Sequence, residues 1–273
     1  MNEPTHGEPR TDYSQAGNRA FETRMAERTV AQSAGFLLPH LSPGMSLLDV
    51  GCGPGSITAG LATAVAPGQV VGIDFQESQV AAARKRAASL GIANARFHAA
   101  DAYALPFDDE SFDVVFAHAV LVHLGDPLRA LKEMRRVLRP GGLVGLRDPD
   151  LFGSGFTFPM TELLELWREI GPRVRAHNGA NPHPAREHRR LLREAGFGRT
   201  MATASVVSAG SADETREQAV WFQDQFRGFA RTAVEQAWMD QATADAIHLE
   251  LAAWGERPDA FHAGVWCATL GWR

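Results

Sequence analysis

The stretch "LLDVGCGPGS", residues 47–56, decides the fold. An apolar run that contains one acidic residue, Asp49, leads directly into Gly51, Gly53 and Gly55. Glycine is used where the backbone turns sharply or where another group must approach it closely. A glycine-rich turn between a strand and a helix also presents backbone N–H groups to a ligand. These residues therefore predict a ligand site at a strand-to-helix turn.

The sequence around this turn alternates between two patterns. Apolar runs typical of strands lie at 46–50, 69–74, 95–100, 112–119 and 142–148, and helical patterns lie at 56–65, 77–90 and 127–138. This rhythm predicts right-handed βαβ units and a parallel sheet with helices on both faces. The fold class expected is α/β, with a doubly wound and mostly parallel sheet.

The rhythm breaks after residue 150. The remaining sequence predicts a helix around 160–170, a second helix that ends at Gly196, a strand at 200–207, an aromatic-rich helical region at 211–256 and a strand at 261–272. We therefore expect these parts: 1–33 as an N-terminal lid, 34–150 as the core, 151–184 and 211–257 as helical cap insertions, and 185–210 and 258–273 as the remainder of the sheet.

Composition narrows the class of protein. The chain has 273 residues, is 45% hydrophobic and has a net charge of −5. A negative chain argues against a nucleic-acid partner, and the basic runs at 83–86 and 186–194 fit solvent-exposed helix faces. No apolar run approaches the roughly 20 residues of a membrane span. We expect a cytoplasmic monomer or homodimer with no membrane partner, in which Cys52 and Cys267 are reduced thiols.

Other nucleotide-binding loops fit the glycine turn less well. The phosphate-binding Walker loop needs a lysine after its last glycine, and "GCGPGS" has none. The dinucleotide fingerprint needs a third glycine where Ser56 stands. Asp49, two residues before the first glycine, would repel a pyrophosphate but would suit a ligand that carries an ammonium group.

"LLDVGCGPGS" resembles motif I of the class I S-adenosylmethionine (SAM)-dependent methyltransferases. Four further segments are similar to the later motifs of this family in the same order: "VVGIDF", "HAADAYALPFDDESFD", "FDVVFAHAVLVHL" and "EMRRVLRPGG". Within this family, the sequence most resembles the UbiE-like small-molecule group. The resemblance covers residues 34–148 closely, and 185–207 and 261–272 more loosely. It implies a Rossmann-like sheet of seven strands whose last strand is antiparallel, a helical cap, and SAM as the cofactor.

The resemblance also implies a set of cofactor-binding residues. Asp74 would accept hydrogen bonds from both ribose hydroxyls, Asp101 would bind the adenine amino group, and Ala102 would lie beside the adenine ring. The full set expected is Tyr13, Asp49, Gly51, Cys52, Gly53, Gly55, Asp74, Phe75, Gln79, Asp101, Ala102 and His118. Simpler roles stay open, because the glycines could only make a turn and the three aspartates could only cap helices or turns.

Methyl transfer from a sulfonium is a displacement, and a base is needed only where the acceptor must lose a proton. His123, expected to titrate near its ordinary pKa of about 6.5, and Asp148 are the candidate catalytic residues, with Asp150 as an alternative. The competing interpretation is that His123 only packs its turn. His177, His183 and His188 lack a metal-ligand spacing, so no metal is expected.

The aromatic residues of the cap predict the kind of acceptor. We expect a flat apolar or heteroaromatic small molecule in natural-product metabolism, with carbon methylation of an indole as a specific case. Oxygen or carbon methylation of a quinone, sterol or polyketide is the alternative. A non-catalytic SAM-binding protein remains a further possibility.

Overall fold

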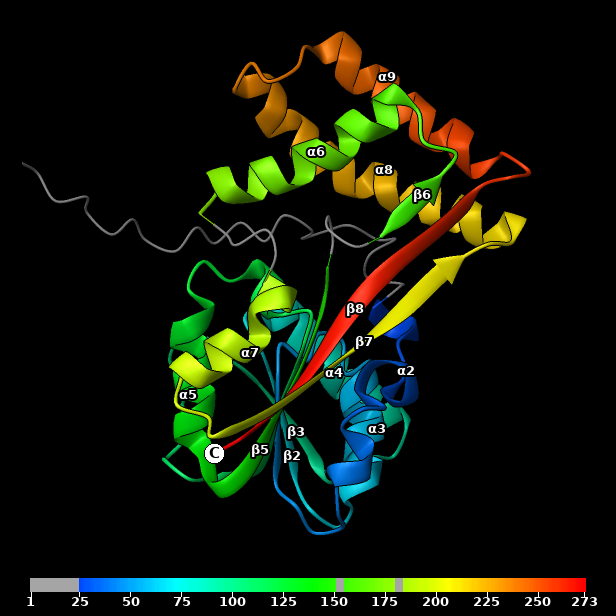
Figure 1. Cartoon of the computed structure of the whole chain (residues 1–273). Helices are drawn as coiled ribbons and strands as arrows, with labels where there is room; N and C mark the ends of the chain where they lie inside the picture. The colour runs from blue at the N-terminus through cyan, green and yellow to red at the C-terminus, as the bar shows by residue number, and fades with distance from the viewer. Residues whose placement is uncertain (1–24, 151–154, 180–183) are drawn as a thin grey trace, which may run out of the picture.

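The computed structural model describes residues 25–150, 155–179 and 184–273. Within these ranges the chain forms an eight-stranded sheet in the order β3-β2-β1-β4-β5-β8-β6, with β7 paired to β8 (Figure 1). The strands are β1 (Leu47–Val50), β2 (Val70–Asp74), β3 (Ala95–Ala99), β4 (Phe112–His118), β5 (Leu138–Pro149), β6 (Phe156–Phe158), β7 (Arg199–Ala209) and β8 (Phe261–Trp272).

The direction of the strands confirms the expected sheet. Strands β1 to β5 pair in parallel, and β8 pairs antiparallel with β5, β6 and β7. The expected number of seven strands is wrong by one, because the short strand β6 forms within the segment 151–184, expected as a helical cap insertion, and pairs with the start of β8. Strand β5 also begins earlier than predicted, since Leu138 already pairs with Phe112.

The helices follow the predicted order, but helix α6 continues to His177, well past the expected end. The helical region 211–256 contains two helices. The break between them comes at Ala237, which has a positive φ of 54°. The helices are α2 (Val30–Ala34), η1 (Leu38–His40), α3 (Ser56–Val65), α4 (Glu77–Ser89), η2 (Leu121–His123), α5 (Pro127–Val137), α6 (Glu162–His177), α7 (Pro184–Glu194), α8 (Ala212–Glu235) and α9 (Gln241–Gly255).

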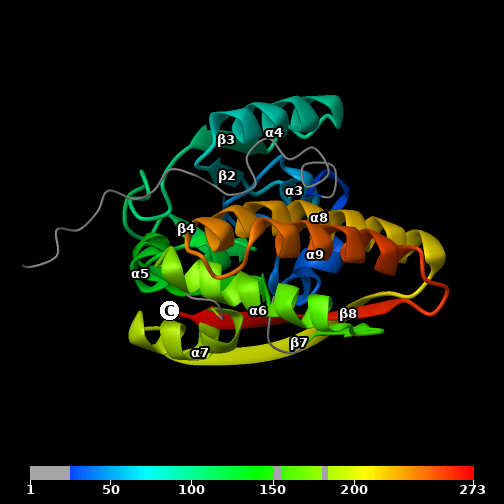
Figure 2. The same ribbon diagram turned by 90° about the horizontal axis from the view of Figure 1, so that it is seen from above.

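Helices cover both faces of the parallel sheet. Helices α5 and α7 lie on one face, and α2, α3 and α4 lie on the other (Figures 1 and 2). Met134 of α5 and Leu192 of α7 belong to one apolar cluster, whereas Leu61 of α3 and Val80 of α4 belong to a second. Strands buried on both sides explain the continuous apolar runs of the sequence.

A third apolar cluster holds the cap layer, formed by α6, α8 and α9, above the carboxyl ends of the parallel strands (Figures 1 and 2). Trp167 of α6 packs against Phe222 of α8 with ring centroids 4.4 Å apart. Trp254 of α9 donates a hydrogen bond from Nε1 to the carbonyl of Phe158 at 3.0 Å. The aromatic residues of 211–256 therefore serve, in large part, as the interior of the cap.

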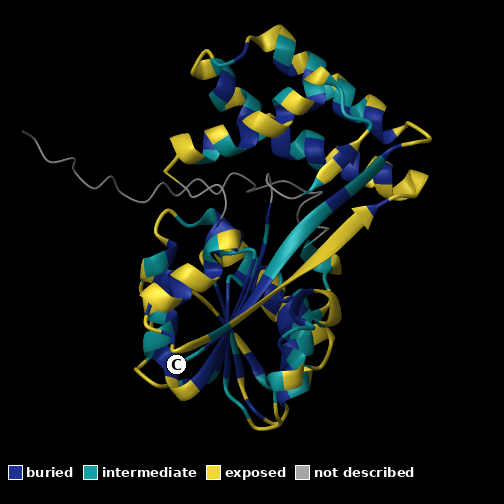
Figure 3. Ribbon diagram, viewed as in Figure 1, coloured by how far each residue is buried: buried dark blue, intermediate teal, exposed yellow. Residues whose placement is uncertain are grey.

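Strands β7 and β8 extend from the sheet toward the cap layer. Most of β7 is exposed along its length (Figure 3).

None of the helices in the described ranges combines the length and the apolar composition that crossing a bilayer requires.

Because the cap layer has its own apolar cluster, we expect it to be destabilised separately from the sheet. Phe226 on α8 is 1% exposed, and Phe226→Ala should cost roughly 3–5 kcal/mol of local stability through lost burial and a cavity. Val220, on the same helix, is 49% exposed, so Val220→Ala should have little effect. Hydrogen exchange should show the loss of protection in α6, α8 and α9 only. Equal loss across the parallel strands would contradict this.

Candidate cofactor and acceptor site

The turn from β1 to α3 is built from three glycines with positive φ angles. Gly51, Gly53 and Gly55 have φ values of +69°, +52° and +75°. A methyl group on Gly51 would lie 2.5 Å from Val120 Cγ2, and one on Gly55 would lie 3.0 Å from Ala83 Cβ. At Gly53 the nearest atom would be 3.8 Å away, so packing does not restrict this position and only the left-handed backbone does. The loop thus keeps an open stretch of backbone at Gly53.

Asp74, the last residue of β2, joins this loop to the neighbouring strand. Its Oδ2 accepts a hydrogen bond from the N–H of Gly53 at 2.9 Å, and its Oδ1 accepts one from the N–H of Gln76 at 2.9 Å. Burial raises the pKa of Asp74, and the backbone hydrogen bonds partly oppose that rise. Phe75, the next residue, is 62% exposed, and Gln79 is half-buried on α4.

Asp49 lies beneath the loop. The residue is 2% exposed, and its Oδ2 accepts a hydrogen bond from Thr58 Oγ1 of α3 at 2.6 Å. Burial, and to a smaller extent the charge of Asp74, raise the pKa of Asp49 to about 7, although the hydrogen bond from Thr58 opposes the rise. Among the described residues no basic side chain lies within ion-pair distance of this carboxyl. A cation bound nearby would therefore favour its ionised form.

The remaining predicted cofactor residues have ordinary surroundings. Asp101 follows β3, and its Oδ1 accepts a hydrogen bond from the N–H of Tyr103 at 2.8 Å, as in a turn aspartate. Ala102 packs, half-buried, against the apolar cluster of α5. Cys52 is buried, and its burial raises the pKa of the thiol. Tyr13 lies outside the described residues. Binding of the cofactor by these residues stays a prediction.

His118, at the end of β4, sits between two arginines. Its Nε2 lies 3.2 Å from Arg147 Nη1 and its Nδ1 lies 3.5 Å from Arg28 Nη1, while its ring stacks on Trp266 at 5.0 Å. Burial lowers the pKa of His118 well below its usual value, and both arginines lower it further. The ring is therefore neutral and can accept from only one arginine at a time.

His123 ends the turn η2 that follows β4. Burial, together with the smaller effects of the Arg175 and Arg28 charges, lowers the pKa of His123 to about 3. Arg175 lies close by, since its Nη1 donates to the carbonyl of Val122 at 2.7 Å. The expectation that His123 titrates near neutrality is therefore wrong, because the ring is buried and its charged neighbours are cationic. A role for the neutral ring beside the acceptor stays a prediction.

Asp148, near the end of β5, is committed to contacts within the protein. It is fully buried, with Oδ1 accepting from the N–H of Val122 at 3.2 Å and Oδ2 lying 3.1 Å from His188 Nε2. His188 Nδ1 in turn lies 3.3 Å from Thr269 Oγ1. Because the carboxylate is buried and bonded within the protein, these contacts do not support the predicted catalytic role of Asp148, which stays a prediction. Asp148 instead fixes η2, the turn that carries His123.

Asp150 is also committed to the protein. It is 3% exposed, and its Oδ2 lies 2.9 Å from a guanidinium nitrogen of Arg186 on α7. This ion pair and the Asp148 contact bind α7 to the end of β5. The alternative role of Asp150 as an acceptor-orienting group therefore has no support in this arrangement.

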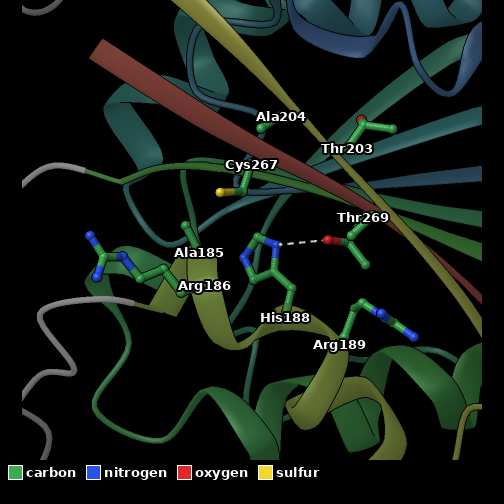
Figure 4. A pocket seen from close by; sticks show the side chains of 9 residues that line it. Ala185, Arg186, His188, Arg189, Thr203, Ala204, Cys267 and Thr269 are labelled. Carbon is green, nitrogen blue, oxygen red and sulfur yellow. Dashed lines mark hydrogen bonds between the residues drawn. The ribbon is translucent and has the colours of Figure 1, made fainter. Parts of the chain in front are cut away.

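A cavity of about 340 Å³ lies between α7 and the strands β7 and β8 (Figure 4). Cys267, His188 and Thr269 are among its lining residues, and none of the predicted cofactor residues is. It opens on the sheet face that carries Asp148, so we do not assign the cofactor to it. In the three described ranges, no three histidine, cysteine, aspartate or glutamate side chains gather in a metal-binding arrangement.

Four residues of this region were not predicted as site residues from the sequence: Arg28, Arg147, Trp266 and His188. A signal existed for Arg147, because a charged residue interrupts the buried run "GLVGLRD". His188 was assigned to a solvent-exposed basic face, yet it is 1% exposed. Neither Arg28 nor Trp266 stands out in its local pattern.

Comparison with known proteins identifies the family. The family model described as "Methyltransferase domain" matches residues 41–196. The chain belongs to this family. Its cofactor is S-adenosyl-L-methionine, and the residues present fit this cofactor. The loop is open at Gly53, Asp74 offers a carboxylate beside it, and Asp49 favours a cation.

Proteins similar to this chain are named as methyltransferases. "Probable methyltransferase ltbC" of Aspergillus luteorubrus is 31% identical, covering 96% of this chain and 97% of its own length. The methyltransferase C1B3.06c of Schizosaccharomyces pombe is 36% identical over 170 residues, and this chain spans only 60% of that protein. Demethylmenaquinone methyltransferase of Staphylococcus aureus is 46% identical over 102 residues, which is 37% of this chain and 42% of that protein.

Solved structures show the same fold. The crystal structure of YcgJ from Bacillus subtilis aligns with a TM-score of 0.59 and 18% identity, covering 89% of this chain and 98% of that one. At this identity the likeness supports the architecture alone.

The buried carboxyl of Asp49 should make stability depend on pH. Its folded-state pKa of about 7 exceeds the unfolded value of 3.8, so the folded state holds a proton that the unfolded state has lost. The unfolding free energy should therefore fall, by roughly 2–4 kcal/mol at most, as pH rises from about 4 to 7. Asp49→Asn should remove this fall and gain stability at pH 8 relative to wild type. Urea unfolding at both pH values measures it, and parallel pH profiles for the two proteins would contradict it.

Asp74 should be needed for cofactor affinity. Asp74→Ala removes a charged acceptor beside the loop, which should weaken S-adenosylhomocysteine binding by roughly 10- to 100-fold. Glu77→Ala is the matched control, because Glu77 lies on the adjacent helix α4 and pairs only with exposed Arg84 at 3.0 Å. Calorimetric titration measures both variants. An unchanged dissociation constant for Asp74→Ala would refute the assignment.

Proposed function

We propose that this methyltransferase transfers the methyl group of SAM to an apolar or heteroaromatic small molecule. The acceptor would lie between the carboxyl edge of the parallel strands and the cap layer. The observation that carries the proposal is the joint presence, at this edge, of the open glycine loop, Asp74 and the buried Asp49 beneath a separate helical layer. In the same proposal, residues 1–33 act as a lid, and 151–184 and 211–257 are cap insertions.

SAM supplies an electrophilic methyl group on a sulfonium. The protein has to hold the acceptor in line with that methyl and keep water out. Asp49 would lie near the positive charge of the cofactor, neutral His118 would border the methionine end of the cofactor, and neutral His123 would lie nearer the acceptor. Because both imidazole rings are neutral, they would not repel the positively charged sulfonium of the cofactor.

The lowered pKa of His123 favours one kind of acceptor atom. A group with a pKa of about 3 is a weak base at neutral pH. Such a base suits an acceptor that attacks before it loses a proton, as an electron-rich ring carbon does. This argument favours carbon methylation, of an indole for example, over methylation of a weakly acidic hydroxyl.

Methylation of a quinone is the second candidate. The similarity to demethylmenaquinone methyltransferase, 46% over 102 residues, favours it, although only 37% of this chain is covered. Sterols and polyketides remain in the same class of apolar acceptors.

A panel experiment tests the proposal. Purified protein with methyl-labelled SAM is incubated with indoles, quinones, sterols and aromatic polyketides, and with transfer RNA and a histone peptide as controls, and products are identified by mass spectrometry. We expect label on a small planar acceptor and none on the macromolecules. Label on a macromolecule, or none on any acceptor while SAM binds, would refute the proposal.

His123 should act through hydrogen bonding and position instead of through titration. At saturating SAM, turnover should be nearly flat between pH 6 and 8, since the pKa of His123 lies far below this window. His123→Gln should lower turnover by roughly 10- to 100-fold and leave S-adenosylhomocysteine affinity unchanged. His98→Gln is the control, because His98 is exposed on β3. Full activity of His123→Gln would remove the residue from the acceptor step.

A further inference from the structure

Arg147 is a charged residue inside the buried strand β5. It is 8% exposed. Its Nη1 lies 3.2 Å from His118 Nε2, its Nη2 donates to Ser205 Oγ at 3.3 Å, and its guanidinium lies 4.6 Å from the centroid of the Trp266 ring. Among the described residues, no carboxylate lies within ion-pair distance of Arg147. All of its contacts are neutral, which is unusual for a buried guanidinium.

The other buried charges of this region are paired. On the opposite face of the sheet, Asp148 contacts His188, and Asp150 forms an ion pair with Arg186. Burial lowers the pKa of Arg147, which is consistent with a guanidinium whose contacts are all neutral. A buried charge without a counter-ion is expected where a ligand supplies that counter-ion.

The register of the sheet places Arg147 beside the cofactor loop but not in it. Arg147 pairs with His118, the last residue of β4, and its other contacts, Trp266 and Ser205, are paired with each other on β8 and β7. Arg147 and its three contacts therefore extend across the sheet from β4 to β7, on the side away from β1 and β2. Gly53 follows β1, and Asp74 ends β2. A ligand at Arg147 would therefore lie on the acceptor side of this edge.

A second positive charge and an aromatic surface border the same place. Arg28 Nη1 lies 3.5 Å from the other ring nitrogen of His118. The His118 ring stacks on the half-buried Trp266 with an interplanar angle of 23°. A planar fork of donors next to stacked aromatic rings has the features that recognise an aromatic or heteroaromatic acid.

We propose that Arg147 binds an acidic group, such as a carboxylate, on the methyl acceptor. This inference rests on the proposed function and makes its acceptor an aromatic or heteroaromatic acid. On binding, the guanidinium would exchange its neutral partners His118 and Ser205 for the oxyanion. One fixed end of the acceptor would then restrict the orientation of the ring that receives the methyl. SAM also carries a carboxylate, so the experiment has to separate the two sources.

The experiment uses two probes of the same shape, 1-naphthoate and the neutral 1-naphthamide, titrated calorimetrically into full-length protein saturated with S-adenosylhomocysteine. Wild type should bind naphthoate at least about 10-fold more tightly than naphthamide. Arg147→Gln should remove this preference while S-adenosylhomocysteine affinity stays within a few-fold. Arg147→Lys, which keeps the charge, should retain part of the preference and checks that loss does not come from misfolding.

Arg199→Gln is the matched control. Arg199 lies 3.7 Å from the centroid of the Trp272 ring, so it makes the same kind of contact with β8, but at the last residue of that strand and not near its middle, where Trp266 lies. This variant should keep both the preference and the cofactor affinity.

Three outcomes would overturn the inference. They are equal affinity of wild type for both probes, no binding of naphthoate at millimolar concentration, and a loss of S-adenosylhomocysteine affinity in Arg147→Gln with an unchanged probe preference. The last result would assign Arg147 to the cofactor's carboxylate. Failure of wild type to bind S-adenosylhomocysteine at all would instead contradict the proposed function, so the two failures are distinct.

Discussion

The hydrogen bond from the N–H of Gly53 to Asp74, at 2.9 Å, joins the ends of the two strands on which the site depends. Strands β1 and β2 are neighbours in parallel register, with Val50 opposite Ile73, so their carboxyl ends meet at one edge. The left-handed glycines let the chain turn there and begin α3 immediately afterwards. A side chain at Gly51 would collide with Val120, which follows β4, so the same turn also sets how closely β4 and its loop approach.

Charge divides this edge into two halves. Asp49 and Asp74 lie at β1 and β2, whereas Arg28, Arg147 and Arg175 surround the rings that end β4 and η2. The acidic half suits a cofactor with a cationic sulfonium. The basic half keeps both histidines neutral, since a nearby positive charge and burial both disfavour protonation. The same electrostatic arrangement therefore accounts for the cofactor preference and for the unusual state of the histidines.

The far face of β5 has a structural task. Asp148 and Asp150 connect η2 and the strand end to α7 through His188 and Arg186. Through these contacts, Asp148 and α7 fix the position of η2, the turn that carries His123. The aromatic residues of the cap, with Phe222 and Trp254 among them, mostly pack on one another, so the cap is a layer with its own interior above the edge.

The sequence by itself determined the features that depend on residues close together in the chain. The glycine loop and the alternation of strands and helices follow from local spacing and its order, and the family resemblance of these motifs implied the antiparallel last strand. Only the tertiary structure decided which carboxylates face a ligand and which protein group sets each pKa. Asp148 meets His188, Arg147 meets Trp266, and His123 lies near Arg175, although each pair is far apart in sequence. Burial and charge depend on such distant neighbours, and spacing along the chain does not specify them.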